Sequence, residues 1–122
     1  MNAPSAPPAN RLDFPKAVRL LRPAEFRDVY DHGWHYRCGL FSAFCLRRGD
    51  APARFGFTVP RAIGKAAFRN RIRRRLREMV RLRRHNFPAG LQIVFNPRRA
   101  LYDAEAERLA EEVDRLIAQC NR

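Results

Sequence analysis

Apolar residues recur at helical spacing in three separate stretches of the chain. After Pro23, which suits the first turn of a helix, Phe26, Val29 and Tyr30 follow at i, i+3 and i+4 until Gly33. Two longer stretches show the same periodicity, with apolar stripes formed by Phe68, Ile72, Leu76, Met79 and Leu82 and by Leu109, Val113, Leu116, Ile117 and Cys120. The pattern predicts three amphipathic helices, and Asp103 is the predicted cap of the last one.

Shorter apolar runs between these helices have the composition of strands. Aromatic and apolar residues dominate positions 34–48, which predicts a short strand followed by a longer one at about Leu40–Arg47. Arg54–Val59 and Leu91–Phe95 are two further predicted strands. The helix between these last two strands makes a βαβ unit.

The whole chain has 122 residues, which is the usual size of one domain. The order helix, three strands, helix, strand, helix predicts an α+β fold with a single four-stranded sheet and three helices. We expect this domain to occupy residues 12–120. Residues 1–11 have no periodic pattern and are rich in Ala, Asn and Pro, so they are predicted to form a disordered tail.

Charge is distributed very unevenly along the chain. Lys and Arg number 25 against 12 Asp and Glu, so the net charge is +13. Between Arg61 and Arg84 eleven residues are basic and only Glu78 is acidic. On a helix, these like charges repel one another across each turn unless an anion neutralises them. The segment therefore predicts a polyanionic partner such as RNA.

The last predicted helix has the opposite character. The stretch 103–119 carries six acids against Arg108 and Arg115. Because the phosphates of RNA are repelled by such a surface, we expect RNA to avoid it. The two long helices are thus predicted to face different surroundings.

Other kinds of site have little support in the sequence. The cysteines and histidines are Cys38, Cys45, Cys120, His32, His35 and His85. They show neither C-x-x-C spacing nor acids at metal-ligand spacing, so we expect reduced thiols and no metal site. The N-terminus lacks the apolar core of a secretory signal, and no apolar run is long enough to cross a bilayer, which predicts a cytoplasmic protein without membrane contact.

The run from Phe55 to Arg77 contains an apolar strand, a Gly64-Lys65 turn and a helix with the tripeptide Arg69-Asn70-Arg71. In this order and spacing it resembles the protein subunit of bacterial ribonuclease P. The resemblance implies the fold of that family and an activity in which the complex with RNA removes the 5′ leader from precursor tRNA. It also implies that the RNA subunit carries the chemistry with Mg²⁺, which the RNA and the substrate bind, and that this chain has no catalytic residue.

The arginine-rich helix and the loop before it form the predicted contact with the RNA subunit. The residues concerned are Arg61, Lys65, Arg69, Asn70, Arg71, Arg73, Arg74 and Arg77. Arg61 and Lys65 lie at the positive end of the helix dipole, which favours phosphate. Two positions depart from the family pattern, because Ala62 replaces a common basic residue and Arg75 replaces a usual Leu. Arg75 lies on the apolar side, so it must snorkel or find an acid, and it is not a predicted RNA contact.

The resemblance also implies a cleft between the first helix and the sheet, which receives the single-stranded leader. Its aromatic residues correspond to Phe26, Tyr30 and Phe44. Stacking of unpaired bases on aromatic rings is compatible with this role. Phe26 and Tyr30 also belong to the apolar stripe of a helix that must pack on something, so a purely structural role is the alternative. Phe41, on the other side of its strand, is predicted core.

The predicted partners are ribonuclease P RNA and precursor tRNA, without DNA. A basic ribosomal or RNA-chaperone protein is the alternative function, since it would share the charge but has no need of an aromatic cleft. A protein nuclease that uses His35 or His85 with carboxylates lacks a supporting constellation.

Overall fold

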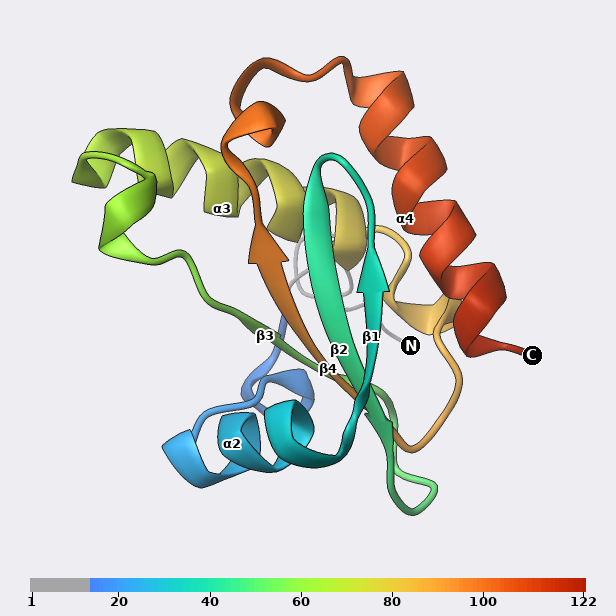
Figure 1. Ribbon diagram of the computed structural model, residues 1–122. Coiled ribbons are helices and arrows are strands. Elements are labelled where there is room, and N and C mark those ends of the chain that lie inside the picture. The colour runs from blue at the N-terminus through green and yellow to red at the C-terminus, as the bar shows by residue number, and fades with distance from the viewer. Residues whose placement is uncertain (1–13) are drawn as a thin grey trace, which may run out of the picture.

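A four-stranded sheet separates three helices in the computed structural model, which describes residues 14–122 (Figure 1). The elements are α2 (Pro23–His32), β1 (Trp34–Arg37), β2 (Phe41–Arg47), β3 (Arg54–Phe57), α3 (Ala66–Arg81), β4 (Leu91–Pro97) and α4 (Ala106–Cys120), with short 3₁₀ turns between some of them. This order confirms the predicted α+β arrangement. The predicted tail, residues 1–11, and the first residues of the predicted domain lie outside the described residues.

The strands lie in the order β1-β2-β4-β3. Neighbouring strands run antiparallel except β3 and β4, which pair in parallel with Phe55 opposite Ile93 and Phe57 opposite Phe95. Parallel neighbours need a long crossover, and α3 provides it. The predicted βαβ unit is therefore present.

Helices α3 and α4 cover one face of the sheet and supply most of the core. Ile72, Leu76 and Val80 of α3 are fully buried, as are Val113 and Leu116 of α4. They pack in one cluster with sheet residues that include Phe41, Ala43, Cys45, Phe55, Ile93 and Phe95. The predicted core position of Phe41 is confirmed. Such burial of large apolar side chains contributes about 1.5–3 kcal/mol each.

Helix α2 lies alone on the opposite face (Figure 1). A second, smaller cluster joins its Val29 to Leu20 and to Val94 of β4, with Phe26 and Phe44 packed at its margin. A ten-residue helix is too short to cover a four-stranded sheet. Part of this face therefore stays accessible.

Glu25 holds the start of α2 against the sheet. Its Oε1 accepts hydrogen bonds from the backbone N–H groups of Leu21 and Arg22, each at 3.0 Å, and its Oε2 lies 2.7 Å from Arg54 of β3. Burial alone would raise the pKa of Glu25, but these donors outweigh it and lower the pKa to about 2. The carboxylate thus fixes both the first turn of the helix and its attachment to β3.

Two details of the sequence prediction are wrong. Leu82 follows the last residue of α3 and is 53% exposed, while Val80, two residues earlier, is buried in its place. Asp103 does not cap α4, because the helix begins three residues later, after Glu105, and no side chain caps it.

Arg75 explains the late start of α4. Its guanidinium donates hydrogen bonds to the carbonyl oxygens of Leu101 (2.6 Å), Tyr102 (3.2 Å) and Ala104. These bonds hold residues 99–104 as a 3₁₀ turn, η4 (Arg99–Asp103), and an extended residue. Arg75 thus binds backbone carbonyl oxygens, which is neither of the two alternatives expected from the sequence, snorkelling or an acid partner.

Candidate RNA-binding surfaces

The outer face of α3 carries a dense group of basic side chains. Asn70, Arg73, Arg74 and Arg77 line a depression of about 200 Å³ on this face. Arg73 Nη1 donates a hydrogen bond to Asn70 Oδ1 at 3.0 Å, which orients both side chains. Because a bound anion relieves the repulsion between neighbouring guanidiniums, the depression is suited to a phosphate group.

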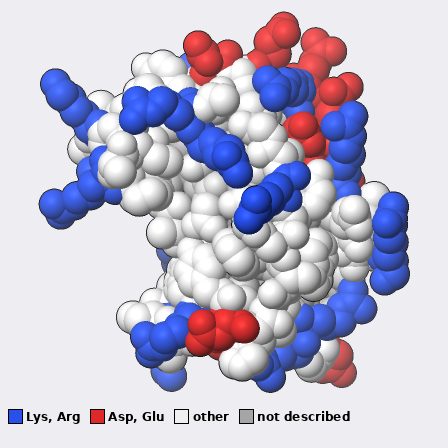
Figure 2. All heavy atoms as spheres, in the orientation of Figure 1, with Lys and Arg blue, Asp and Glu red and all other residues white. Residues whose placement is uncertain are grey.

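Basic side chains also surround the start of α3. Arg61, in the turn η2 (Arg61–Ile63), and Lys65, the residue before α3, are both exposed. Within residues 14–122, the side chains of Arg61, Lys65 and Arg74 have no hydrogen-bonding or ion-pair partner. Figure 2 shows long basic side chains projecting from the end of the molecule where α3 begins. Their charges are available to an external anion.

Two neighbouring arginines have part of their hydrogen-bonding capacity occupied. Arg71 Nε donates to the carbonyl oxygen of Tyr102 at 3.2 Å, and its guanidinium lies 4.9 Å from the centre of the Tyr102 ring. Arg69 Nε donates to the carbonyl oxygen of Gly64 at 3.1 Å. A guanidinium has five N–H donors, so both side chains can bind a phosphate while they keep these contacts. Asn70 and the basic residues from Arg61 to Arg77, without Arg75, are called the arginine surface below.

Acidic side chains gather over α4, away from the arginine surface (Figure 2). Asp114 of α4 pairs with Arg83 at 2.8 Å, and Glu112 lies 3.4 Å from Arg115. Most other acids of this helix are exposed. A long polyanion is therefore attracted to one side of the molecule and repelled by another.

Aromatic rings meet on the sheet face that α2 leaves open. Tyr30 of α2 contacts Phe44 of β2 edge to face, with ring centroids 4.9 Å apart. His35 of β1 lies flat against Phe44, with centroids 4.1 Å apart and planes 10° apart. Asn96 Nδ2 of β4 donates a hydrogen bond to the Tyr30 hydroxyl at 2.9 Å. Together with Phe26 these rings form what we call the aromatic face.

A pocket of about 220 Å³ joins the aromatic face to the arginine surface. Phe26, Gly56 and Phe57 line it from α2 and β3, and Arg73 and Arg77 line it from α3. The Phe26 ring rests directly on Gly56, where an added Cβ would lie 2.6 Å from Phe26 Cε2. In Figure 2 the outline is indented between α2 and the start of α3, and the lining atoms are mostly uncharged. Residues predicted for two different roles thus share one hollow.

The acids of α2 that point to the sheet are neutralised. Asp28 Oδ2 lies 2.9 Å from Arg48 Nε, and Glu25 pairs with Arg54 as described. The more exposed of the two pairs, Asp28–Arg48, contributes little to stability. Their effect here is to cancel negative charge beside the aromatic face, which lowers the repulsion of a nucleic acid strand.

Comparison with known proteins identifies the family. The family model for ribonuclease P matches residues 14–121, which is nearly all of the chain. The chain belongs to the ribonuclease P protein family. The ribonuclease P protein component of Clostridioides difficile is 30% identical over 87% of this chain and 94% of its own length. That of Desulfovibrio desulfuricans is 40% identical over 66% of this chain and 63% of its own length.

Solved structures of the ribonuclease P family have the same fold. The ribonuclease P protein from Thermotoga maritima superimposes with a TM-score of 0.74 at 27% identity, over 83% of this chain and 96% of that one. The chain is therefore the protein component of the ribonuclease P holoenzyme, a tRNA-processing endoribonuclease that acts in 5′ maturation of tRNA. It associates with ribonuclease P RNA. The alternative of a ribosomal or RNA-chaperone protein is set aside.

His35 is a residue of the aromatic face that the sequence analysis missed for this surface. In the sequence it stands near a glycine turn with no acid at ligand spacing, and nothing there indicates a stacking role. In the structure Arg37 Nε lies 3.2 Å from its Nδ1, and burial together with Arg37 and Arg98 lowers the pKa of His35. The ring is thus a neutral flat surface. Its place opposite Phe44 in the strand ladder depends on the register, which local sequence does not specify.

Residues 14–122 contain no group of three or more His, Cys, Asp or Glu side chains that could hold a metal ion. No helix in the same range has the length and apolar character needed to cross a membrane. Cys45 and Cys120 are buried in the core and Cys38 is half-buried, as expected for packing residues with free thiols.

Proposed function

We propose that this chain serves ribonuclease P by holding two RNAs on two adjoining surfaces. The arginine surface binds ribonuclease P RNA through Arg61, Lys65, Arg69, Asn70, Arg71, Arg73, Arg74 and Arg77. The aromatic face binds the 5′ leader of precursor tRNA through Phe26, Tyr30 and Phe44, with His35 as an added member. The observation that carries the proposal is the pocket lined by both Phe26 and Arg73, because it brings the two surfaces within reach of one RNA junction.

The arginine surface is suited to folded RNA because it presents charge without reading bases. Arg61, Lys65 and Arg74 are exposed and unpartnered within residues 14–122, so they can meet phosphates without losing a protein contact. Each phosphate neutralised releases counterions, which makes binding strong at low salt and weak at high salt. The partly engaged Arg69 and Arg71 add fixed geometry to this charge.

The aromatic face is suited to a single strand because unpaired bases can stack on its rings. Tyr30 is 36% exposed, and Phe44 and Phe26 are half-buried, so their edges and faces are reachable while their inner sides pack on Val29 and Val94. The proposed binding role is thus compatible with the structural role, since packing occupies only the inner sides of the rings. Stacking contributes about 1–3 kcal/mol per base and tolerates any base.

Selection of substrate over product follows from the leader. Precursor tRNA has a leader that can reach the aromatic face, whereas mature tRNA has none. Binding energy gained only with the precursor raises its affinity relative to the product and helps release of mature tRNA. The protein takes part in the reaction by binding, not by chemistry.

Cleavage itself is assigned to the RNA subunit. Mg²⁺ ions held by the RNA and the substrate would activate water and stabilise the leaving oxygen. Four acids, Glu107, Glu111, Glu112 and Asp114, lie on α4, and the α2 acids Glu25 and Asp28 are paired with Arg54 and Arg48. The proposed setting is the cytoplasm, and neither DNA nor a membrane is a proposed partner.

The decisive experiment compares precursor and mature tRNA with the holoenzyme. Phe44→Ala should weaken precursor binding by about fivefold to a hundredfold and leave mature tRNA binding nearly unchanged. Tyr36→Ala is a matched control, since Tyr36 is a half-buried ring on the neighbouring strand that faces the core. If Phe44→Ala lowered the affinity for precursor and mature tRNA equally, the proposal would be contradicted.

A further inference from the structure

Trp34, the only tryptophan of the chain, is unusually exposed for its size, at 43%. It begins β1, which is an edge strand, and its ladder partner Cys45 faces the main core. Side chains alternate across a strand, so Trp34 lies on the α4 side of the sheet and His35 on the α2 side. Nothing in the proposed arginine surface or aromatic face requires this ring.

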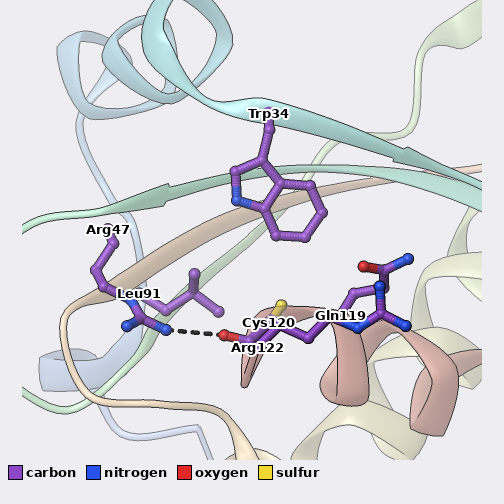
Figure 3. Close-up of a pocket in the computed structure, with 6 residues that line it drawn as sticks. All are labelled: Trp34, Arg47, Leu91, Gln119, Cys120 and Arg122. Atoms are coloured by element: carbon purple, nitrogen blue, oxygen red, sulfur yellow. Dashed lines mark hydrogen bonds between the residues drawn. The ribbon is translucent and has the colours of Figure 1, made fainter.

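The indole borders a pocket of about 240 Å³ between β1 and the end of α4. Trp34, Leu91 and Cys120 give it apolar walls, and Arg47 and Arg122 are its charged lining residues. Figure 3 shows the indole pointing from β1 toward the last turn of α4. Arg47 Nη2 donates a hydrogen bond to the carbonyl oxygen of Cys120 at 2.8 Å, which holds this guanidinium at the rim.

The chemistry of the pocket selects an aromatic, anionic group. Its one large ring has an accessible face, and both charged side chains that line it are basic, with no acid among the lining residues. An unpaired nucleotide has a base for the indole and a phosphate for a guanidinium. The protein already works with RNA, so an RNA nucleotide is the occupant that fits.

The position of the pocket indicates which RNA supplies this nucleotide. His35 of the aromatic face and Trp34 are consecutive residues of the same edge strand, so a strand that passes over His35 reaches Trp34 by turning around the edge. The arginine surface is carried by α3, which joins β4 to β3, the edge strand at the opposite edge of the sheet from β1. A leader bound on the aromatic face therefore has a shorter route to the Trp34 pocket than ribonuclease P RNA bound on the arginine surface.

We propose that the Trp34 pocket binds an unpaired leader nucleotide that lies farther from the cleavage site than those on the aromatic face. The inference rests on the proposed function, since it needs a leader on the aromatic face. Binding at the Trp34 pocket would make the affinity for precursor tRNA depend on the length of the leader.

The test uses the fluorescence of Trp34, which is the only tryptophan of the holoenzyme because RNA has none. Holoenzyme is titrated with mature tRNA and with precursors whose leaders increase in length. Stacking of a base should quench the emission only when the leader exceeds a threshold length. Unchanged emission with every RNA, or quenching by mature tRNA or by addition of the RNA subunit alone, would overturn the inference.

Affinity measurements give an independent readout. Trp34→Ala should weaken binding of long-leader precursors by about fivefold to tenfold and should not affect short-leader precursors. Trp34→Phe should recover part of the loss, and Arg122→Gln should shift the quenching to higher RNA concentration. Leu82→Ala removes another exposed apolar side chain, at the end of α3, and should show no dependence on leader length.

The results separate the two proposals. If Phe44→Ala weakens precursor binding while Trp34→Ala has no effect at any leader length, the Trp34 pocket is refuted and the aromatic face stands. If Phe44→Ala itself lacks a precursor-specific effect, the proposed function fails, and the pocket proposal fails with it.

Discussion

The arginine surface and the aromatic face adjoin each other but are built on different physical principles. The arginine surface lies on one helix and its preceding loop, and its binding would come from charge. The aromatic face is assembled from α2, β1 and β2, with β4 contributing a hydrogen bond, and its binding would come from stacking. Charge acts over distance and is screened by salt, whereas stacking needs contact and is much less sensitive to salt. Changes in each surface should therefore have distinguishable effects.

The largest effect is expected from removing unpartnered charge. Replacing Arg61, Lys65 and Arg74 together with Gln should lower affinity for ribonuclease P RNA by about a hundredfold at low salt and flatten the log-log salt dependence by about 2–3. The melting temperature should stay nearly constant, because these side chains are exposed and make no hydrogen bond or ion pair within residues 14–122. Binding titrations over a range of salt concentrations measure both quantities. An unchanged salt dependence would show that these residues of the arginine surface do not contact the RNA.

Gly56→Ala tests the pocket that joins the two surfaces. The added methyl would collide with the Phe26 ring, so the ring must move and the fold should lose about 1–3 kcal/mol. Precursor affinity should fall several-fold while the salt slope of RNA-subunit binding stays the same. Gly39→Ala is the matched control, since its new Cβ meets only the flexible end of Arg108. If Gly56→Ala lowered the affinity for precursor tRNA and for the RNA subunit equally, the pocket would have no specific role in leader binding.

Arg75 and Arg74 are neighbours on α3 that should behave in opposite ways. Arg75→Leu removes hydrogen bonds to three carbonyls and should lower the free energy of unfolding by about 1–3 kcal/mol, with little change in the salt slope. Arg74→Leu should reduce RNA affinity and leave the stability unchanged. Urea unfolding and RNA titration of both variants give the comparison. A stable Arg75→Leu protein with weak RNA binding would reverse the assignment.

The smallest effect concerns the attachment of α2. The pKa of Glu25 is about 2 in the folded protein against an ordinary value of 4.5, so its ionised form stabilises the fold. The stabilisation is fully present above about pH 4.5 and is lost as the pH falls toward 2. Glu25→Gln should therefore cost about 1–2 kcal/mol near neutral pH, and the difference should disappear near pH 2. Unfolding curves across this pH range would show a constant difference if Glu25 were only a packing residue.

Much of the architecture was predictable because helical and strand periodicity are local. The order of the elements, the buried faces of α3 and α4 and the excess of bases over acids in α3 agree with the sequence patterns. The errors lie at helix ends. Leu82 matched the spacing but followed the last turn, and Asp103 had the right chemistry for a cap that the contacts of Arg75 prevent from forming.

The candidate site was predictable only in part. Aligning the chain with a family pattern indicated Phe44 and Tyr30, but it did not show that His35 lies flat on Phe44 or that Asn96 holds Tyr30. These contacts join residues on different strands and helices. Their geometry depends on the register between neighbouring strands, which a local stretch of sequence does not specify.

Sequence alone determined what kinds of surface this protein could have, because charge and periodicity belong to single segments: a basic helix, an acidic helix and an aromatic first helix. Tertiary structure decided which members of those segments are available. It turned Arg75 inward, left the Arg74 side chain without a hydrogen bond or ion pair among residues 14–122 and exposed Trp34 at an edge. Such differences between neighbouring residues arise from contacts between segments that are distant in the chain, where burial and hydrogen bonding select among side chains of the same type.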